Sequence, residues 1–127
     1  MIGSTTWVVA DGYIPATSTG PAPDLTSHES VCVLNAGDAD ATVQIHVHFT
    51  DRDAAGPYVL RVPAGRIHHQ RLNDLLHPEP VPRGVDYGLV LRSDVPVVVQ
   101  HTRLDSRQPA NALMSTIAYA PPAGEAR

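Results

Sequence analysis

Polar side chains crowd the end of one strongly apolar stretch, residues 97–108, VVVQHTRLDSRQ. Three valines are followed by Gln100, His101, Arg103 and Asp105. Amide, imidazole, guanidinium and carboxylate groups together supply hydrogen-bond donors, acceptors and a permanent positive charge. If the apolar part forms a strand, these groups stand at the end of a rigid sheet, where they can bind a ligand or stabilise the sheet itself.

A second polar group frames residues 26–37, TSHESVCVLNAG. His28 and Glu29 begin a short apolar run, and Asn35 ends it. Imidazole, carboxylate and amide groups again stand where a predicted strand starts or stops. The two stretches are therefore the candidates for a common site.

Two interpretations of these stretches are open. In the structural one, Arg103 and Asp105 form an ion pair at a sheet end, which is a common role for such residues. In the functional one, Glu29, His101 and Arg103 are held by the sheet and line a polar pocket. The residues alone favour the structural interpretation, because polar strand ends are usual.

A pair of histidines lies on one face of the alternating segment 41–50, ATVQIHVHFT. His46 and His48 point the same way because side chains two residues apart in a strand share a face. An H-x-H pair of this kind begins cupin-type metal sites. The pattern then stops, since Asp51 and Asp53 stand in a turn and no glutamate follows where such a motif requires one. We therefore predict no metal site and no cofactor.

Catalytic side chains can be selected from the sequence, but no motif joins them. A Ser-His-Asp or Cys-His set would draw on Ser27, Ser106, Cys32, His101 and Asp105. No nucleophile elbow or related motif fixes their geometry. The single cysteine stands in an apolar run, as a small strand residue does. We predict that the chain is not an enzyme.

Short strands would position these side chains. Runs rich in β-branched and aromatic residues alternate with turns rich in Gly, Pro, Asn and Asp. Eight strands are predicted, at residues 5–10, 29–34, 41–50, 58–62, 66–72, 86–92, 95–102 and 113–119. One short helical turn is expected near 72–76, before a proline-rich segment that cannot continue a helix. The predicted fold class is all-β, an antiparallel two-sheet sandwich of jelly-roll type.

Size and charge limit the possible classes of protein. The chain has 127 residues, of which 43% are hydrophobic and 17% charged. These values suit a single β-sandwich domain, which we place at 1–120, followed by a flexible C-terminal tail at 121–127. The net charge of −4 opposes binding to polyanions, so sequence-specific recognition of nucleic acid is not expected. Without an apolar run of membrane-spanning length or a signal-peptide pattern, we expect a cytoplasmic protein.

Several longer motifs resemble one known family. They are WVVADGYIP at 7–15, SHESVCVLNAGD at 27–38, GPY at 56–58, VVVQHTRLDSRQ at 97–108 and NALMSTIAY at 111–119. Together they resemble the sensory rhodopsin transducer family, the soluble partner of a cyanobacterial sensory rhodopsin. The likeness runs from about Trp7 to Tyr119, but it does not include the pair His46 and His48.

The resemblance implies a single β-sandwich of jelly-roll type that assembles as a cyclic homotetramer and has no known catalytic activity. The founding member is described as binding the cytoplasmic face of a membrane-embedded photoreceptor and passing its signal on, and DNA binding has also been proposed. Relatives that occur without a rhodopsin have been viewed as small-molecule binding domains, for sugars or related metabolites. A symmetric neighbour would also cover the sheet edges that a small sandwich leaves unprotected.

Two functions follow from the resemblance: a signalling adaptor for a photoreceptor, and a stand-alone domain that binds a sugar or sugar acid. A DNA-binding regulator is the third and least supported. For a ligand, Arg103 would bind an oxygen pair while Glu29 and Asp105 accept hydroxyl protons. Trp7 would offer a stacking face or belong to the core. The predicted ligand-binding residues are His28, Glu29, Asn35, Arg71, Gln100, His101, Arg103 and Asp105.

Overall fold

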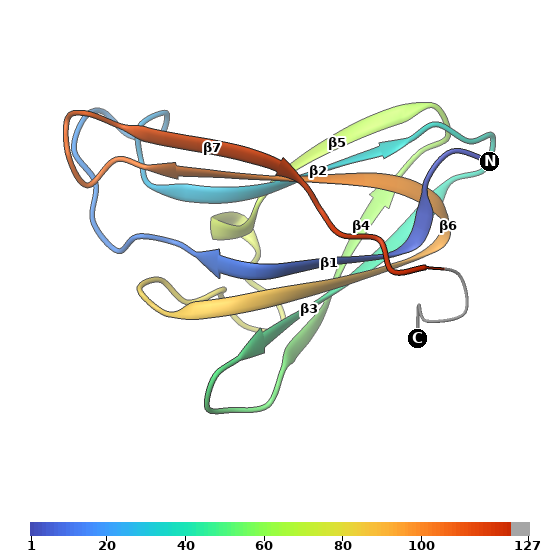
Figure 1. Ribbon diagram of the computed structural model, residues 1–127, viewed down its shortest axis with the longest axis horizontal. Helices are drawn as coiled ribbons and strands as arrows, with labels where there is room; N and C mark the ends of the chain where they lie inside the picture. The colour runs from blue at the N-terminus through green and yellow to red at the C-terminus, as the bar shows by residue number, and fades with distance from the viewer. Residues whose placement is uncertain (123–127) are drawn as a thin grey trace.

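A strongly curved antiparallel sheet makes up almost the whole molecule (Figure 1). The computed structural model describes residues 1–122, so most of the predicted tail, 123–127, lies outside the described residues. The elements are β1 (Ser4–Tyr13), β2 (His28–Asn35), β3 (Ala41–Phe49), β4 (Ala55–Val62), β5 (Arg66–Arg71), the 3₁₀ turn η1 (Leu72–Asp74), β6 (Asp86–Asp105) and β7 (Ala112–Ile117). The predicted all-β class with antiparallel pairing is confirmed.

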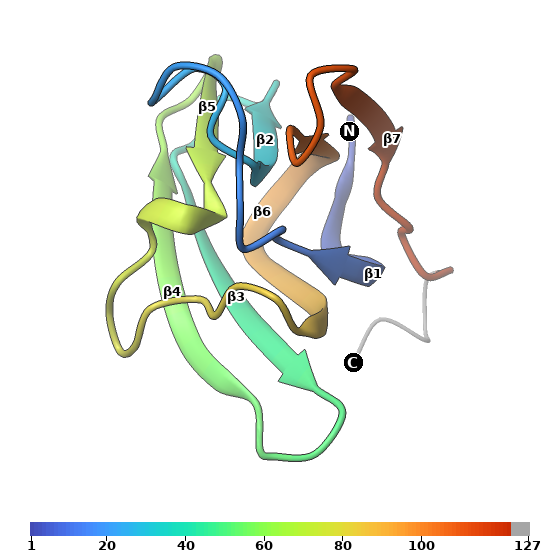
Figure 2. The same ribbon diagram turned by 90° about the vertical axis from the view of Figure 1, so that its left-hand side faces the viewer.

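The long strand β6 organises the sheet. Its first half pairs with β1 on one side and β3 on the other, and its second half pairs with β2 and β7. Strand β4 extends the sheet beyond β3, and β5 extends it beyond β2. Figure 2 shows the resulting curl, with β1 and β7 on one side of β6 and β3, β4 and β5 on the other.

Two predicted strands, 86–92 and 95–102, are parts of this one strand, so the described chain has seven strands and not eight. The turn-like residues between them, Ser93, Asp94 and Pro96, leave the backbone extended. The carboxylate of Asp94 accepts a hydrogen bond of 2.8 Å from the backbone N–H of Thr42 on the neighbouring strand. The pairing with β1 shifts register at this point, so the strand bends here and continues.

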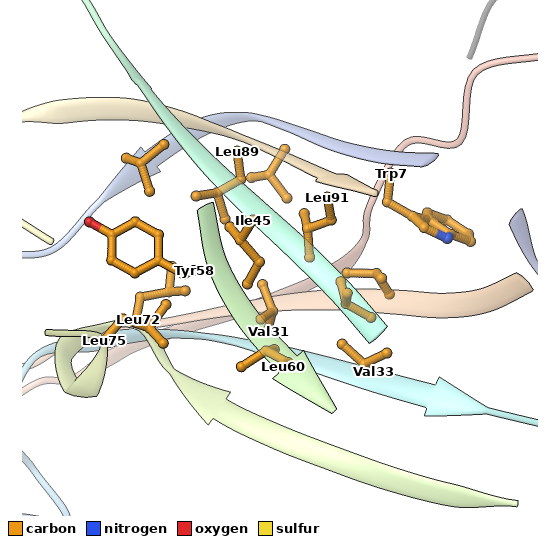
Figure 3. Packing of buried hydrophobic residues seen from close by; sticks show 14 of the residues in the cluster. Trp7, Val31, Val33, Ile45, Tyr58, Leu60, Leu72, Leu75, Leu89 and Leu91 are labelled. Carbon is orange, nitrogen blue, oxygen red and sulfur yellow. The ribbon is translucent and has the colours of Figure 1, made fainter. Parts of the chain in front are cut away.

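The concave side of the sheet encloses the core (Figure 3). The alternation predicted from the sequence is present: Val43, Ile45 and Val47 of β3 are fully buried. Trp7 is 7% exposed, and its Nε1 donates to the carbonyl oxygens of Ser4 and Val97. Trp7 is therefore a core residue, and no stacking face is offered to a ligand. Each large side chain buried in this way stabilises the fold by about 1.5–3 kcal/mol.

The short helical turn fixes the start of β2. It covers Leu72–Asp74, shorter than the predicted 72–76, and Leu72 is fully buried. The amide of Asn73 bridges to the neighbouring segment: its Nδ2 donates to the carbonyl of Ser27, and its Oδ1 accepts from the backbone N–H of Glu29, at 3.1 and 3.4 Å. The turn thus holds Glu29 at the entrance of its strand.

The curl of the sheet is consistent with the predicted β-sandwich. Among the described residues there is no helix long and apolar enough to cross a membrane.

Candidate functional site

Glu29 lies at the centre of a buried polar cluster. Strand pairing places Glu29 directly opposite Arg103. His101 lies two residues from Arg103 on β6, so its side chain is on the same inward face. Glu29 and His101 are 0% and 1% exposed, whereas the Arg103 side chain is 23% exposed. The structure therefore brings together three of the eight predicted site residues, and it places them against the core.

The Glu29 carboxylate accepts four hydrogen bonds. Oε1 accepts from the Tyr87 hydroxyl and lies 3.0 Å from Nε2 of His101. Oε2 accepts from Nε of Arg103 at 2.6 Å and from the backbone N–H of Tyr13 at 2.9 Å. A carboxylate offers about four lone-pair positions, so all of them are occupied. Glu29 is left without an oxygen position for a ligand hydroxyl, which was its predicted role.

Electrostatics keep this carboxylate ionised. Burial raises the pKa of Glu29, but the hydrogen bonds from His101, Tyr87, the Tyr13 backbone and Arg103 outweigh burial, and the pKa lies below its ordinary value. Burial and the nearby Glu29 charge raise the pKa of the Tyr87 hydroxyl. Tyr87 therefore stays neutral and donates, and the Arg103 guanidinium balances the buried negative charge.

A hollow of about 280 Å³ lies next to the cluster, between β1 and β7. Both strands pair with β6, and beyond the end of β7 the backbones of Val8 and Tyr119 exchange hydrogen bonds. His101 lines the hollow from β6, and most of the other lining residues are apolar. Of the residues in the cluster, His101 is the one that borders the hollow.

The remaining predicted site residues on β6 do not join the cluster. Gln100 points to the opposite face of the sheet from His101, where its Nε2 donates to the Ser115 hydroxyl at 2.6 Å. Asp105 pairs with Arg107 in the turn after the strand, at 2.6 Å. The expected Arg103–Asp105 ion pair is therefore absent from the described chain. The pairing register of β2 and β6 explains this difference, because it places Glu29 directly opposite Arg103 and Glu29 becomes the partner of the guanidinium.

Three further predicted residues serve local structure. Asn35 ends β2 far from Glu29, and its Nδ2 donates to the carbonyls of Ala39 and Val62 while its Oδ1 accepts from the N–H of Gly37. His28 has Nδ1 2.7 Å from the carbonyl oxygen of Thr26. Arg71, on β5, donates from Nη1 to the carbonyl of Pro23. Each of these side chains organises a nearby loop.

Sequence reasoning missed Tyr87 and Tyr13, which complete the cluster from the first half of β6 and the end of β1. Tyr87 occupies an inward position of a predicted strand, but nothing in the sequence pairs it with Glu29. Gly12 is the one trace of this contact in the sequence. A Cβ added there would lie 2.3 Å from Cε1 of Tyr87, so only glycine leaves room for the ring.

The two serines of the suggested catalytic set also have structural partners. The Ser27 and Ser106 hydroxyls lie 3.1 Å apart and are both buried, and Ser27 also accepts from the N–H of Ser106. Their hydrogen bonds tie the loop before β2 to the end of β6. Burial raises the pKa of the Cys32 thiol, so it is less readily ionised.

No three His, Cys, Asp or Glu side chains of residues 1–122 gather closely enough to hold a metal ion. His46 and His48 alternate with the buried valines and isoleucine of β3 and point away from the core. His48 is exposed, whereas Nδ1 of His46 is buried without a hydrogen-bond partner among these residues.

Comparisons with known proteins identify the family and agree with the fold. The model of the Anabaena sensory rhodopsin transducer family matches residues 2–120. A solved structure, the Anabaena sensory rhodopsin transducer, is 52% identical with a TM-score of 0.73, over 80% of this chain and 97% of that one. A Thermotoga maritima protein, 1070, is 35% identical with a TM-score of 0.84, over 94% and 96%. No curated protein matches. The chain belongs to the sensory rhodopsin transducer family.

Proposed function

We propose that this chain is a non-enzymatic signalling adaptor, a homotetramer in the cytoplasm that binds a membrane-embedded sensory rhodopsin at its cytoplasmic face. Each subunit would contribute one domain, residues 1–120, of jelly-roll type. The family match over 2–120 carries the proposal. The surface of the second half of the sheet supports the assembly.

The outer face of strands β5, β2, β6 and β7 is a broad surface with few charges. Paired residues form apolar rows across it: Leu34 lies between Ile67 and Val98, and Leu104 lies beside Leu113. Ile67 is 66% and Leu113 is 71% exposed. Large apolar side chains on the outer face of a sheet usually mark an interaction surface. A second copy would cover this face and the unprotected edge of β7.

The net charge of −4 suits the second contact that an adaptor needs. Cytoplasmic loops of membrane proteins tend to be basic, so an acidic tetramer and the loops of a rhodopsin attract each other. Attraction of this kind weakens as salt screens it.

Anabaena sensory rhodopsin in detergent provides a direct test of the adaptor function, because the Anabaena transducer is 52% identical to this chain. We expect the two proteins to elute together from a sizing column in low salt, and to separate progressively as salt is added. Separate elution at every salt concentration would contradict the adaptor function.

The second candidate function is a stand-alone domain that binds a sugar or sugar acid, and the partly exposed side chain of Arg103 favours it. The Arg103 guanidinium would donate hydrogen bonds to such a ligand, whereas the oxygens of Glu29 are already hydrogen-bonded. A panel of sugars and sugar acids should then raise the melting temperature of the wild type but not of Arg103→Ala. A melting temperature that no compound moves would contradict this function.

DNA binding is the third candidate. It would need a basic patch that includes Arg52, yet Arg52 is paired with Glu79. Binding that weakens steeply with salt would be its signature.

A further inference from the structure

We propose that the hollow between β1 and β7 binds a small, neutral, mostly apolar molecule that donates one hydrogen bond to Nδ1 of His101. This ligand differs in chemical class from a sugar or sugar acid. The inference concerns the chain itself and does not depend on a photoreceptor.

The position of His101 makes Nδ1 the group available to a ligand. Nε2 is committed to Glu29, and a carboxylate only accepts, so the neutral ring carries its hydrogen on Nε2 and a lone pair on Nδ1. No group of residues 1–122 forms a hydrogen bond with Nδ1. Glu29 and the surrounding core also fix the orientation of the ring, so the acceptor is preorganised.

Nδ1 borders the hollow, although the His101 side chain as a whole is only 1% exposed. Three buried side-chain polar atoms of the described chain lack partners, namely Ser30 Oγ, His46 Nδ1 and Ser93 Oγ, and Nδ1 of His101 is not among them. His101 lines the hollow between β1 and β7. Nδ1 is therefore the atom of His101 that a ligand N–H or O–H in the hollow would satisfy.

The shape of the hollow favours a small molecule over a peptide strand. At one end Val8 and Tyr119 exchange backbone hydrogen bonds of 2.7 and 2.9 Å. At the other end, Arg103 reaches across to the carbonyl of Asp11, with Nη2 3.5 Å from the oxygen. A continuous peptide strand would have to displace one of these contacts. A volume of about 280 Å³ lies just below the range of about 300–1,000 Å³ for small-molecule sites, so only a compact ligand fits.

The lining determines the chemical class. Val9, Ala10, Met114 and Ala118 contribute apolar surface, and the imidazole is the one buried polar side chain among the residues that line the hollow. A polyol would lose hydration at several hydroxyl groups there and regain only part of it, which costs free energy. A compact apolar molecule with a single donor loses little and pairs that donor.

Indole and benzofuran form a matched pair of probes, because they share a shape and only indole has an N–H donor. We would titrate each into the ¹⁵N-labelled full chain at pH 8 and follow amide and imidazole resonances. We expect indole to shift the amides of Val9, Ala10 and Thr116 and the ¹⁵N resonance of His101 Nδ1. Indole should bind about fivefold more tightly than benzofuran, the usual contribution of one neutral hydrogen bond.

Two variants on one strand provide the control. Thr116 pairs with His101 and lines the hollow, whereas its neighbour Ser115 is on the opposite face of β7. Both are exposed, so phenylalanine at either position leaves the core intact. Thr116→Phe should fill the hollow and abolish indole binding, and Ser115→Phe should retain it.

Equal affinity for the two probes, binding that persists in Thr116→Phe, or no saturable shift with indole would each overturn the inference. The rhodopsin experiment separates this result from the adaptor function. Co-elution with rhodopsin but no indole binding contradicts this inference alone, and indole binding without co-elution contradicts the adaptor function alone.

Discussion

Nε2 of His101 lies 3.0 Å from Oε1 of Glu29, and both side chains are almost completely buried. Around this contact, Tyr87 binds Glu29 from the first half of β6 and Arg103 binds it from the second half. The carboxylate therefore joins both halves of the bent strand to β2, and through the Tyr13 N–H it also joins β1. The polar groups at the end of the valine-rich strand thus stabilise the curl of the sheet.

Replacing Glu29 tests this structural role. Glu29→Gln leaves the Arg103 charge without its partner and places an N–H₂ donor where the carboxylate accepted. We expect the free energy of unfolding in urea, at fixed protein concentration, to fall by about 3 kcal/mol. Glu79→Gln is the control, because it breaks an exposed pair with Arg52, and it should cost about 0.5 kcal/mol. Similar losses in the two variants would contradict the role of Glu29.

The lowered pKa of Glu29 predicts sensitivity to acid. A carboxyl whose folded-state pKa lies below its unfolded value stabilises the fold fully above the unfolded pKa, ordinarily 4.5, and loses that contribution as pH falls through the folded pKa. The free energy of unfolding should therefore decline below about pH 4.5. Other carboxylates add to the decline, so the informative quantity is the difference between the wild type and Glu29→Gln. Parallel curves would show that Glu29 contributes nothing.

Gly12 is expected to be required for the position of Tyr87. In Gly12→Ala the new Cβ would lie 2.3 Å from Cε1 of the ring, so the ring must move away and weaken its bond to Glu29. Overpacking of this kind costs about 2 kcal/mol, measurable in urea. Gly37→Ala is the matched control, since its Cβ would meet only Asn35 Oδ1, at 3.3 Å. An unchanged stability in Gly12→Ala would mean that Tyr87 is not confined.

Replacing Asn35 tests whether its side chain stabilises a loop or binds a ligand. Asn35→Ala removes three hydrogen bonds that hold the turn after β2, so we expect a loss of about 2 kcal/mol in the free energy of unfolding. Indole binding, measured by the same amide shifts as above, should be unchanged. If the variant is as stable as the wild type but no longer binds indole, Asn35 has the ligand role predicted from sequence.

The sequence predicted the strands well because their inward positions alternate. Val43, Ile45 and Val47 identify both the strand and its buried face without any tertiary information. The predicted break between residues 92 and 95 was wrong, because Ser, Asp and Pro favour turns in isolation. The neighbouring strands kept the backbone extended there, with Thr42 binding Asp94.

The candidate site was predicted only in part, for two physical reasons. Adjacent strand residues face opposite sides, so Gln100 cannot share a pocket with His101. Pairing register, which the sequence does not reveal, decides that Glu29 meets Arg103 and that Asp105 is left to pair with Arg107. The polar composition indicated where the cluster lies, but not that Tyr87 and Tyr13 would saturate its carboxylate.

Sedimentation velocity on single-charge variants tests the proposed assembly most directly. Ile67→Glu places a charge on the outer face of β5, and Val59→Glu places one on the outward face of β4, at a residue that is 50% exposed. We predict a tetramer for the wild type and for Val59→Glu, and smaller species for Ile67→Glu. A monomeric wild type, or a tetramer that persists in Ile67→Glu, would contradict the proposed self-association through this face.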